Sequence, residues 1–250
     1  MTQSQATNTA SRPAGGRLAG QRVVVIGGTR GIGFAAAQAV AAEGGEVVVA
    51  SRNPGHVARA VAALGPSASG HALDIGDRQA AAAFFAQVGP FDHLVTTAAQ
   101  VLRKSLLEAD LDEARASFEG KFWGQVHAAR FGAPLIRPGG SIVLVSGISS
   151  RRGLGGMAFP SAINGAIEAL SRSLAVSLAP IRVNTVSPGY IDTPGHGGAE
   201  RSAVLKKVAA AIPAGRPGRP EEVAQAIVYL ITNPFSTCTV LDIDGGHLAS

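Results

Sequence analysis

The sequence predicts an α/β fold in which one seven-stranded parallel sheet is covered by helices on both faces, a doubly wound three-layer sandwich. Two observations predict this class. First, short apolar runs alternate with longer Ala-rich segments along the chain, and strands that alternate with helices form parallel sheets with right-handed crossovers. Second, the chain has 250 residues, of which 46% are hydrophobic and 16% charged, and this composition suffices for a core on both sides of a sheet.

Each expected strand is a short apolar run, and each expected helix is a longer Ala-rich or amphipathic segment between two such runs. The expected strands are residues 23–27, 46–50, 69–73, 91–96, 140–146, 181–187 and 238–243. The expected helices are residues 31–43, 55–64, 77–88, 111–133, 158–179 and 220–232, with an irregular helical region at 194–211. Ligands of such sheets bind beyond the carboxyl ends of the strands. The loops expected to line one cleft are therefore 27–33, 51–53, 74–76, 96–101, 146–156 and 187–196.

The glycine-rich turn after the first strand predicts a dinucleotide site. Residues 23–33 read Val-Val-Val-Ile-Gly-Gly-Thr-Arg-Gly-Ile-Gly. Gly27 lets the chain leave the strand, Gly31 lets the backbone approach a pyrophosphate, and Gly33 lets the helix lie close to the sheet. The amides at the helix start then face the anion. Because the glycines stand between an expected strand and an expected helix, they predict a Rossmann-type fold that binds a dinucleotide.

The residues after the second strand favour NADP(H) over NAD(H). An NAD enzyme usually offers a carboxylate to the adenosine ribose at this place, whereas this chain offers Ser51 and Arg52. Arg30 lies nearby in the glycine turn, and two guanidinium groups would clamp a 2′-phosphate through charge-assisted hydrogen bonds. The alternative is that Arg30 and Arg52 are solvated surface side chains.

Composition argues against several other classes. The net charge is +5 with a sequence pI near 10, but the arginines are scattered, so we expect no nucleic acid partner. No apolar run approaches the roughly 20 residues that span a bilayer, so we expect no membrane partner. Residues 1–16 are polar and small, so we expect a disordered tail, a cytoplasmic protein and one domain at residues 17–250. The single cysteine, Cys238, excludes an internal disulfide and is expected to be a small buried residue near the last strand.

Five segments together resemble the short-chain dehydrogenase/reductase family, and the resemblance covers residues 18–247. They are Gly-Gly-Thr-Arg-Gly-Ile-Gly at 27–33, Leu-Asp-Ile at 73–75, Gly-Gly-Ser-Ile-Val at 139–143, Ile-Arg-Val-Asn-Thr-Val-Ser-Pro-Gly at 181–189 and Asp-Gly-Gly at 244–246. The resemblance implies that Asp74 with Ile75 contacts adenine and that residues after the sixth strand hold the nicotinamide. The full set expected at the coenzyme is Gly27, Thr29, Arg30, Gly31, Ile32, Gly33, Ser51, Arg52, Asp74, Ile75, Thr97, Ala98, Pro188, Gly189, Ile191 and Thr193.

The resemblance also implies an acid/base site that this chain lacks in its usual form. The family normally uses an Asn, a Ser and a Tyr-x-x-x-Lys pair, whose tyrosine passes a proton to the carbonyl oxygen as hydride arrives. The tyrosine and lysine positions fall on Pro160 and Asn164. The serine position falls on Gly147, next to Ser146 and Ser149. The family's Asn-Asn-Ala-Gly after the fourth strand reads Thr-Thr-Ala-Ala at 96–99.

Lys121 stands where the family's helix supplies the asparagine, so lysine and asparagine have exchanged places between two helices that face one cleft. The chain has only four lysines, and Phe118, Phe122 and Trp123 bracket this one. Burial would lower its pKa toward neutrality and make it a proton donor, or it would orient substrate or the nicotinamide ribose. The alternative is a lysine that extends along the helix surface or a subunit interface.

Several other side chains besides Lys121 are candidates to replace the tyrosine hydroxyl that position 160 lacks. The candidate catalytic set is Lys121, Asn164, Ser146, Ser149 and Tyr190, with Ser161 and His196 as further hydroxyl and acid groups. His127 is expected to be a packing residue, and no histidine shows a metal-binding pattern.

The leading hypothesis is an NADPH-dependent reductase with rearranged acid/base machinery, acting on a small carbonyl, an imine or an activated C=C substrate. The alternative is a non-catalytic NADP-binding sensor or partner subunit, and a nucleic acid binder ranks last. Helices 111–133 and 158–179 carry small and apolar residues on more than one face, so we expect a homo-oligomer, a dimer or tetramer. The Pro- and Gly-rich stretches 188–198 and 213–220 either frame a substrate lid or are ordinary loops.

Overall fold

The computed structural model describes residues 15–98, 101–193 and 201–250. Its strands form one seven-stranded sheet in the order β3-β2-β1-β4-β5-β6-β7, and every neighbouring pair is parallel. The strand order reverses between β1 and β4, which is the switch point where ligands bind in such sheets. The predicted Rossmann-type doubly wound fold is confirmed. The strands are β1 (Arg22–Ile26), β2 (Glu46–Ser51), β3 (Ala68–Ala72), β4 (Phe91–Thr96), β5 (Ile136–Val145), β6 (Arg182–Pro188) and β7 (Val240–Ile243).

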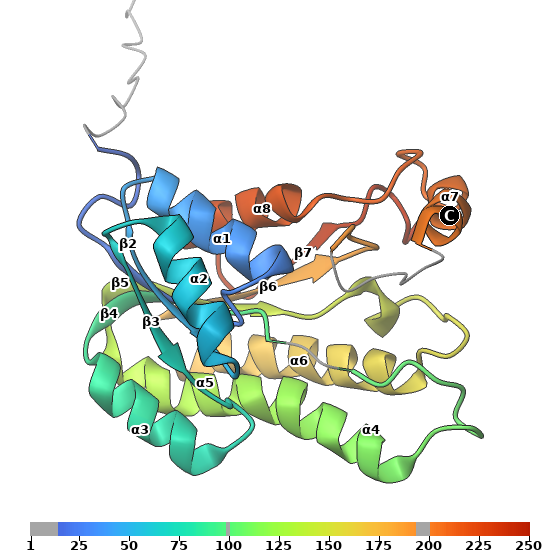
Figure 1. Cartoon of the computed structure of the whole chain (residues 1–250), viewed down its shortest axis with the longest axis horizontal. Helices are drawn as coiled ribbons and strands as arrows, with labels where there is room; N and C mark the ends of the chain where they lie inside the picture. Colours follow the sequence, from blue (N-terminus) through green and yellow to red (C-terminus); the bar gives the residue numbers. More distant parts are fainter. Residues whose placement is uncertain (1–14, 99–100, 194–200) are drawn as a thin grey trace, which may run out of the picture.

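Helices cover both faces of the sheet (Figure 1). One face carries α1, α2 and α8, and the other carries α3, α5 and α6. The helices are α1 (Gly31–Ala42), α2 (Pro54–Leu64), α3 (Arg78–Val88), α4 (Leu111–Ser117), α5 (Gly124–Gly132), α6 (Ala158–Ser177), α7 (Arg201–Ala210) and α8 (Pro220–Thr232), and the shorter turns are η1 (Phe118–Trp123), η2 (Ala133–Leu135) and η3 (Ile148–Ser150).

Alternate residues of each central strand feed the two cores. In β1, Val23 and Val25 belong to the cluster with α1 and α8, whereas Val24 and Ile26 belong to the cluster with α3, α5 and α6. Successive side chains of a strand point to opposite faces, so a strand covered on both sides must be apolar throughout. This is why residues 23–26 of β1 and 47–50 of β2 read as unbroken apolar runs.

The segment predicted as one helix at 111–133 is helical but not uniform. The turn η1 is a π-helix between α4 and α5, and a 3₁₀ turn, η2, follows α5. A π-helical turn contains an extra residue and shifts the register of the helix that follows. Such turns are frequent at functional sites. Lys121 lies within η1 and is buried.

The prediction for Cys238 is wrong, because this residue is exposed. The last strand begins at Val240 rather than at residue 238, so Cys238 belongs to the turn before it. Its φ of 61° lies in the left-handed region, and its amide donates to Val183 O at 2.8 Å. The turn keeps its backbone bonded while directing the side chain outward.

Several expectations fall outside the described residues. They are residues 1–14 of the predicted tail, Ala99, His196, and residues 194–198 of the stretch 188–198 that was expected to frame a substrate lid or form an ordinary loop. Within the part of the chain that is described, no helix is long and apolar enough to cross a membrane. No three His, Cys, Asp or Glu side chains of that part gather where they could hold a metal ion.

Candidate functional site

The glycine turn between β1 and α1 is tightly packed against the end of β4. A Cβ atom on Gly27 would lie 2.6 Å from the Ala98 amide nitrogen, and one on Gly33 would lie 2.2 Å from Gly27 O and 2.3 Å from Thr97 Oγ1. Thr97 is held in turn by Ile26 O, which accepts from both its amide and its hydroxyl. Only glycine therefore fits at positions 27 and 33.

The start of α1 is open to an anion. No described side chain caps this helix end, and its first turn contains no acidic residue. The first amides of a helix have no partner within the helix and carry partial positive charge. Gly31, at the first helical position, has a φ of +53°, and a Cβ there would lie 3.3 Å from Thr193 Cγ2. The turn after β1 therefore meets the segment after β6, and both border the switch point.

The ends of β2 and β3 supply the remaining predicted coenzyme residues on this side. Ser51 is half-buried at the end of β2, and Arg30 and Arg52 are exposed. Asp74 is exposed and accepts from the Gly76 amide at 3.0 Å. Ile75 is buried.

A buried lysine lies at the other side of the switch point. Lys121 is 6% exposed, and its Nζ donates to Asn164 Oδ1 at 2.6 Å and to Ser146 O at 3.1 Å. Burial away from water, followed by the nearby charge of Arg103, lowers the pKa of Lys121 from 10.5 to about 8. The two residues that the sequence places in exchanged positions are thus hydrogen-bonded to each other.

Asn164 also orders the loop that follows β5. Its Nδ2 donates to Ser149 Oγ at 3.0 Å. A Cβ on Gly147 would come within 2.9 Å of that nitrogen, so a side chain at position 147 would displace the amide. Four of the five candidate catalytic residues, Lys121, Asn164, Ser146 and Ser149, therefore form one hydrogen-bonded group.

Tyr190 comes from the segment that follows β6. It is half-buried after β6, and its carbonyl accepts from the Gly218 amide at 2.9 Å. Ile191, also predicted at the nicotinamide, is buried and forms an isolated bridge with Gly218. Gly189 packs against Asp244, whose Cα would lie 2.8 Å from a Cβ at position 189.

Comparison with known proteins identifies the family. Residues 26–247 match a family model described as enoyl-(acyl carrier protein) reductase. A short-chain dehydrogenase/reductase of Stachybotrys chlorohalonatus is 34% identical, and the alignment covers 92% of this chain and 97% of that protein. The chain belongs to the short-chain dehydrogenase/reductase family.

Two further relatives of this short-chain dehydrogenase/reductase have a named activity or a bound coenzyme. A 3-oxoacyl-[acyl-carrier-protein] reductase of Mus musculus is 36% identical, with 89% of this chain and 95% of that protein covered. A solved small-chain dehydrogenase in complex with NADPH is 37% identical, with a TM-score of 0.81, and the match covers 92% of this chain and 99% of that one.

Two buried polar residues of this short-chain dehydrogenase/reductase, Gln125 and Glu168, were missed from the sequence. Gln125 Nε2 donates to Val145 O at 3.1 Å, and its Oε1 accepts from Thr96 Oγ1 at 2.7 Å. Glu168 Oε1 accepts from Ser146 Oγ at 2.9 Å. His127 Nδ1 lies 3.0 Å from Ile75 O, so the packing residue also holds the loop after β3.

A signal for both missed residues was present in the sequence. Gln125 follows Lys121 by four positions, and Glu168 follows Asn164 by four. Residues four apart share one helix face, so a polar residue at that spacing from a buried polar one marks an extended polar face.

Proposed function

We propose that this short-chain dehydrogenase/reductase is an NADP(H)-dependent oxidoreductase with an atypical acid/base site. It would transfer a hydride between nicotinamide and a small carbonyl, imine or activated C=C substrate. The observation that carries the proposal is the buried Lys121, whose Nζ lies 2.6 Å from Asn164 Oδ1. This pair stands in for the tyrosine and lysine that positions 160 and 164 do not supply.

The coenzyme site is proposed at the open start of α1. The glycines at 27, 31 and 33 let a diphosphate approach the backbone, where the amides replace a charged side chain. Thr29 and Ile32 belong to the same turn, and Thr97 and Ala98 back it at the end of β4. The relative solved in complex with NADPH supports a nicotinamide coenzyme at this edge of the sheet.

The preference for NADP(H) rests on charge. Arg30 and Arg52 are exposed, and Ser51 is a neutral hydroxyl at the position where a carboxylate would repel a 2′-phosphate. Each charge-assisted hydrogen bond from a guanidinium to the phosphate would contribute about 1.5–3 kcal/mol. NAD(H), which lacks that phosphate, would gain nothing from these contacts.

The bound coenzyme supplies the hydride, and the protein supplies or withdraws the proton. An amine whose pKa is about 8 is mostly protonated at neutral pH and releases its proton readily, as a general acid requires. Pro160 has no hydroxyl, so Lys121 is the group proposed to donate to the substrate or to the ribose of the coenzyme. Asn164 and the Ser146 carbonyl orient the ammonium.

A site without the tyrosine hydroxyl favours activated substrates. An imine that is already protonated, or a conjugated C=C whose charge spreads over a carbonyl, needs little help during hydride transfer. Positioning of the reactants then supplies most of the rate.

Single-turnover oxidation of NADPH tests the proposal. Parent protein, Lys121→Ala and Lys121→Met would be mixed with NADPH and a panel of carbonyl, imine and enone substrates, with Lys207→Met as the control for loss of an exposed lysine. We expect the two Lys121 variants to lose most of the rate while Lys207→Met keeps it. Equal rates in all four proteins would remove Lys121 from the mechanism, and NADPH binding without oxidation of any substrate would favour the sensor or partner-subunit alternative.

A single cytoplasmic domain that assembles into a homo-oligomer is part of the same proposal. Leu111 on α4 is 58% exposed and Val176 on α6 is 78% exposed, and large apolar side chains on helix faces favour association. Light scattering tests the assembly, and a monomer at micromolar concentration would contradict it.

A further inference from the structure

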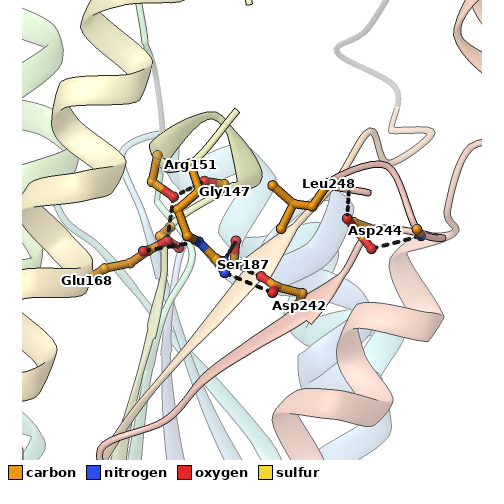
Figure 2. Close-up of polar contacts among 10 residues, drawn as sticks. Gly147, Arg151, Glu168, Ser187, Asp242, Asp244 and Leu248 are labelled. Atoms are coloured by element: carbon orange, nitrogen blue, oxygen red, sulfur yellow. Dashed lines mark hydrogen bonds and ion pairs between the residues drawn. The ribbon is translucent and has the colours of Figure 1, made fainter. Parts of the chain in front are cut away.

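Two ion pairs and a hydrogen bond of Arg151 join the segment after β5 to β7, α6 and β6. Arg151 donates from both terminal nitrogens to the carboxylate of Asp242 on β7, one contact being 3.0 Å. It also donates to Ser187 Oγ at the end of β6 at 3.2 Å. On the other side, Arg151 Nε lies 3.5 Å from Glu168 Oε2 on α6. Figure 2 shows the guanidinium between the two carboxylates; we call Glu168, Arg151 and Asp242 the carboxylate clamp.

The clamp holds the loop after β5 through Glu168. This side chain is only 5% exposed, and its Oε1 lies 2.9 Å from Ser146 Oγ and 2.6 Å from Ser150 Oγ. A buried carboxylate is unfavourable unless a cation and hydrogen-bond donors compensate it. Arg151 provides that cation, so removing it would leave Glu168 without its counter-ion and weaken its hold on the loop.

The same loop carries the groups that contact Lys121 and Asn164. The Ser146 carbonyl accepts from Lys121 Nζ, and Ser149 Oγ accepts from Asn164 Nδ2. Gly147 lies within the loop and Gly153 follows it, and glycine restricts the backbone least. Backbone hydrogen bonds such as Ser146 N to Val186 O and Ser150 N to Gly147 O hold part of this stretch, and the clamp adds side-chain contacts to them.

We propose that Arg151 is a positioning residue, which fixes the Ser146 carbonyl and the Ser149 hydroxyl through Glu168 and so sets the Lys121–Asn164 pair. It acts through these residues and not on the reacting atoms. Its effect on turnover rests on the function proposed above, whereas its effect on Lys121 does not.

Titration of the Lys121 side chain tests the proposal without any substrate. The chain has four lysines, so protein made with lysine labelled with ¹³C at Cε gives few signals, and Lys121→Met assigns the one of interest. The variants are Arg151→Met and Arg151→Lys. The control is Arg137→Met, because Arg137 forms a similar partly exposed pair with Asp92, 2.9 Å apart, at the other end of β5.

We expect Arg151→Met to move the Lys121 midpoint down by about one pH unit, because the ammonium loses part of a charge-assisted hydrogen bond. This loss is expected to outweigh the opposite effect of removing a positive charge and leaving Glu168 without its counter-ion. Arg103 is the neighbouring charge that also acts on Lys121, and it is unchanged in every variant. Arg151→Lys should recover part of the shift, since an ammonium keeps the charge without the two-pronged contact to Asp242. Arg137→Met should cause no shift.

An unchanged or raised midpoint in Arg151→Met, or an equal fall in Arg137→Met, would overturn the proposal. If Arg151→Met fails to fold, Arg151→Lys takes its place, because it keeps the positive charge but not the two-pronged contact to Asp242. Its midpoint should lie below that of the parent, and an unchanged or raised midpoint there would also overturn the proposal. A protein that oxidises no NADPH would refute the proposed function and leave this titration as a test of the clamp.

Discussion

Removal of the buried ammonium should change how the stability of the protein depends on pH. In the folded state the pKa of Lys121 is lowered from 10.5 to about 8, because burial disfavours the charged form. Above 10.5 the amine is neutral in both states, and below about 8 it is charged in both. Between these values the unfolded chain binds more protons, so the free energy of unfolding rises with pH across this window.

The size of the effect follows from the difference in pKa. One unit corresponds to about 1.4 kcal/mol, so the fall from 10.5 to about 8 corresponds to about 3 kcal/mol. Urea unfolding of the parent and of Lys121→Met, at fixed protein concentration and at several pH values from 7 to 10.5, measures it. The stability of the parent relative to the variant should increase by about 3 kcal/mol over that range.

Comparison of two proteins cancels the other groups that titrate in alkali. The variant also leaves Asn164 Oδ1 and Ser146 O without their donor, but this loss does not depend on pH. Lys207→Met, which removes an exposed ammonium, is the control for the loss of one charge. A stability difference between parent and Lys121→Met that stays constant from pH 7 to 10.5 would refute the assigned burial of the charge.

Four further outcomes are expected. Gly33→Ala should abolish NADPH binding by calorimetry and lower the melting temperature, because the added Cβ would lie 2.2 Å from a carbonyl oxygen; normal binding would contradict the tight turn. Arg52→Ala should weaken NADP affinity about tenfold or more and leave NAD affinity unchanged, and equal losses for both would reject the 2′-phosphate contact. His93→Gln should reduce the decrease in the free energy of unfolding as the pH falls from 6.5 to 4, because burial lowers the pKa of His93 to about 4 and the unfolded chain therefore binds the proton first. Urea unfolding at several pH values measures this, and the same decrease in parent and variant would contradict it. Arg182→Met should lower the free energy of unfolding by about 2–4 kcal/mol, because the guanidinium donates to three carbonyls at the end of α8 and in the turn that follows, and a loss under 0.5 kcal/mol would show that water replaces it.

The sequence by itself determined the sheet, its helices and the glycine turn. These features depend on local patterns, since an unbroken apolar run marks a strand buried on both faces and glycines after a strand mark a close backbone approach. It also placed Lys121 and Asn164 on two helices that face one cleft, in positions exchanged relative to the family's motif. The structure adds the hydrogen bond of 2.6 Å between them, while their roles in chemistry stay a prediction.

Only the tertiary structure decided how the site is built. The π-helical turn at Phe118–Trp123 shifts the helix register, which apolar spacing does not reveal. Glu168 and Arg151 are 17 residues apart, and Asp242 is 91 residues beyond Arg151, so their pairing depends on how α6, β6 and β7 pack. Cys238 is likewise exposed in a turn with a φ of 61°, which the apolar pattern of the sequence does not reveal. Local sequence fixes which elements form, but contacts between distant side chains arise only when the elements are assembled.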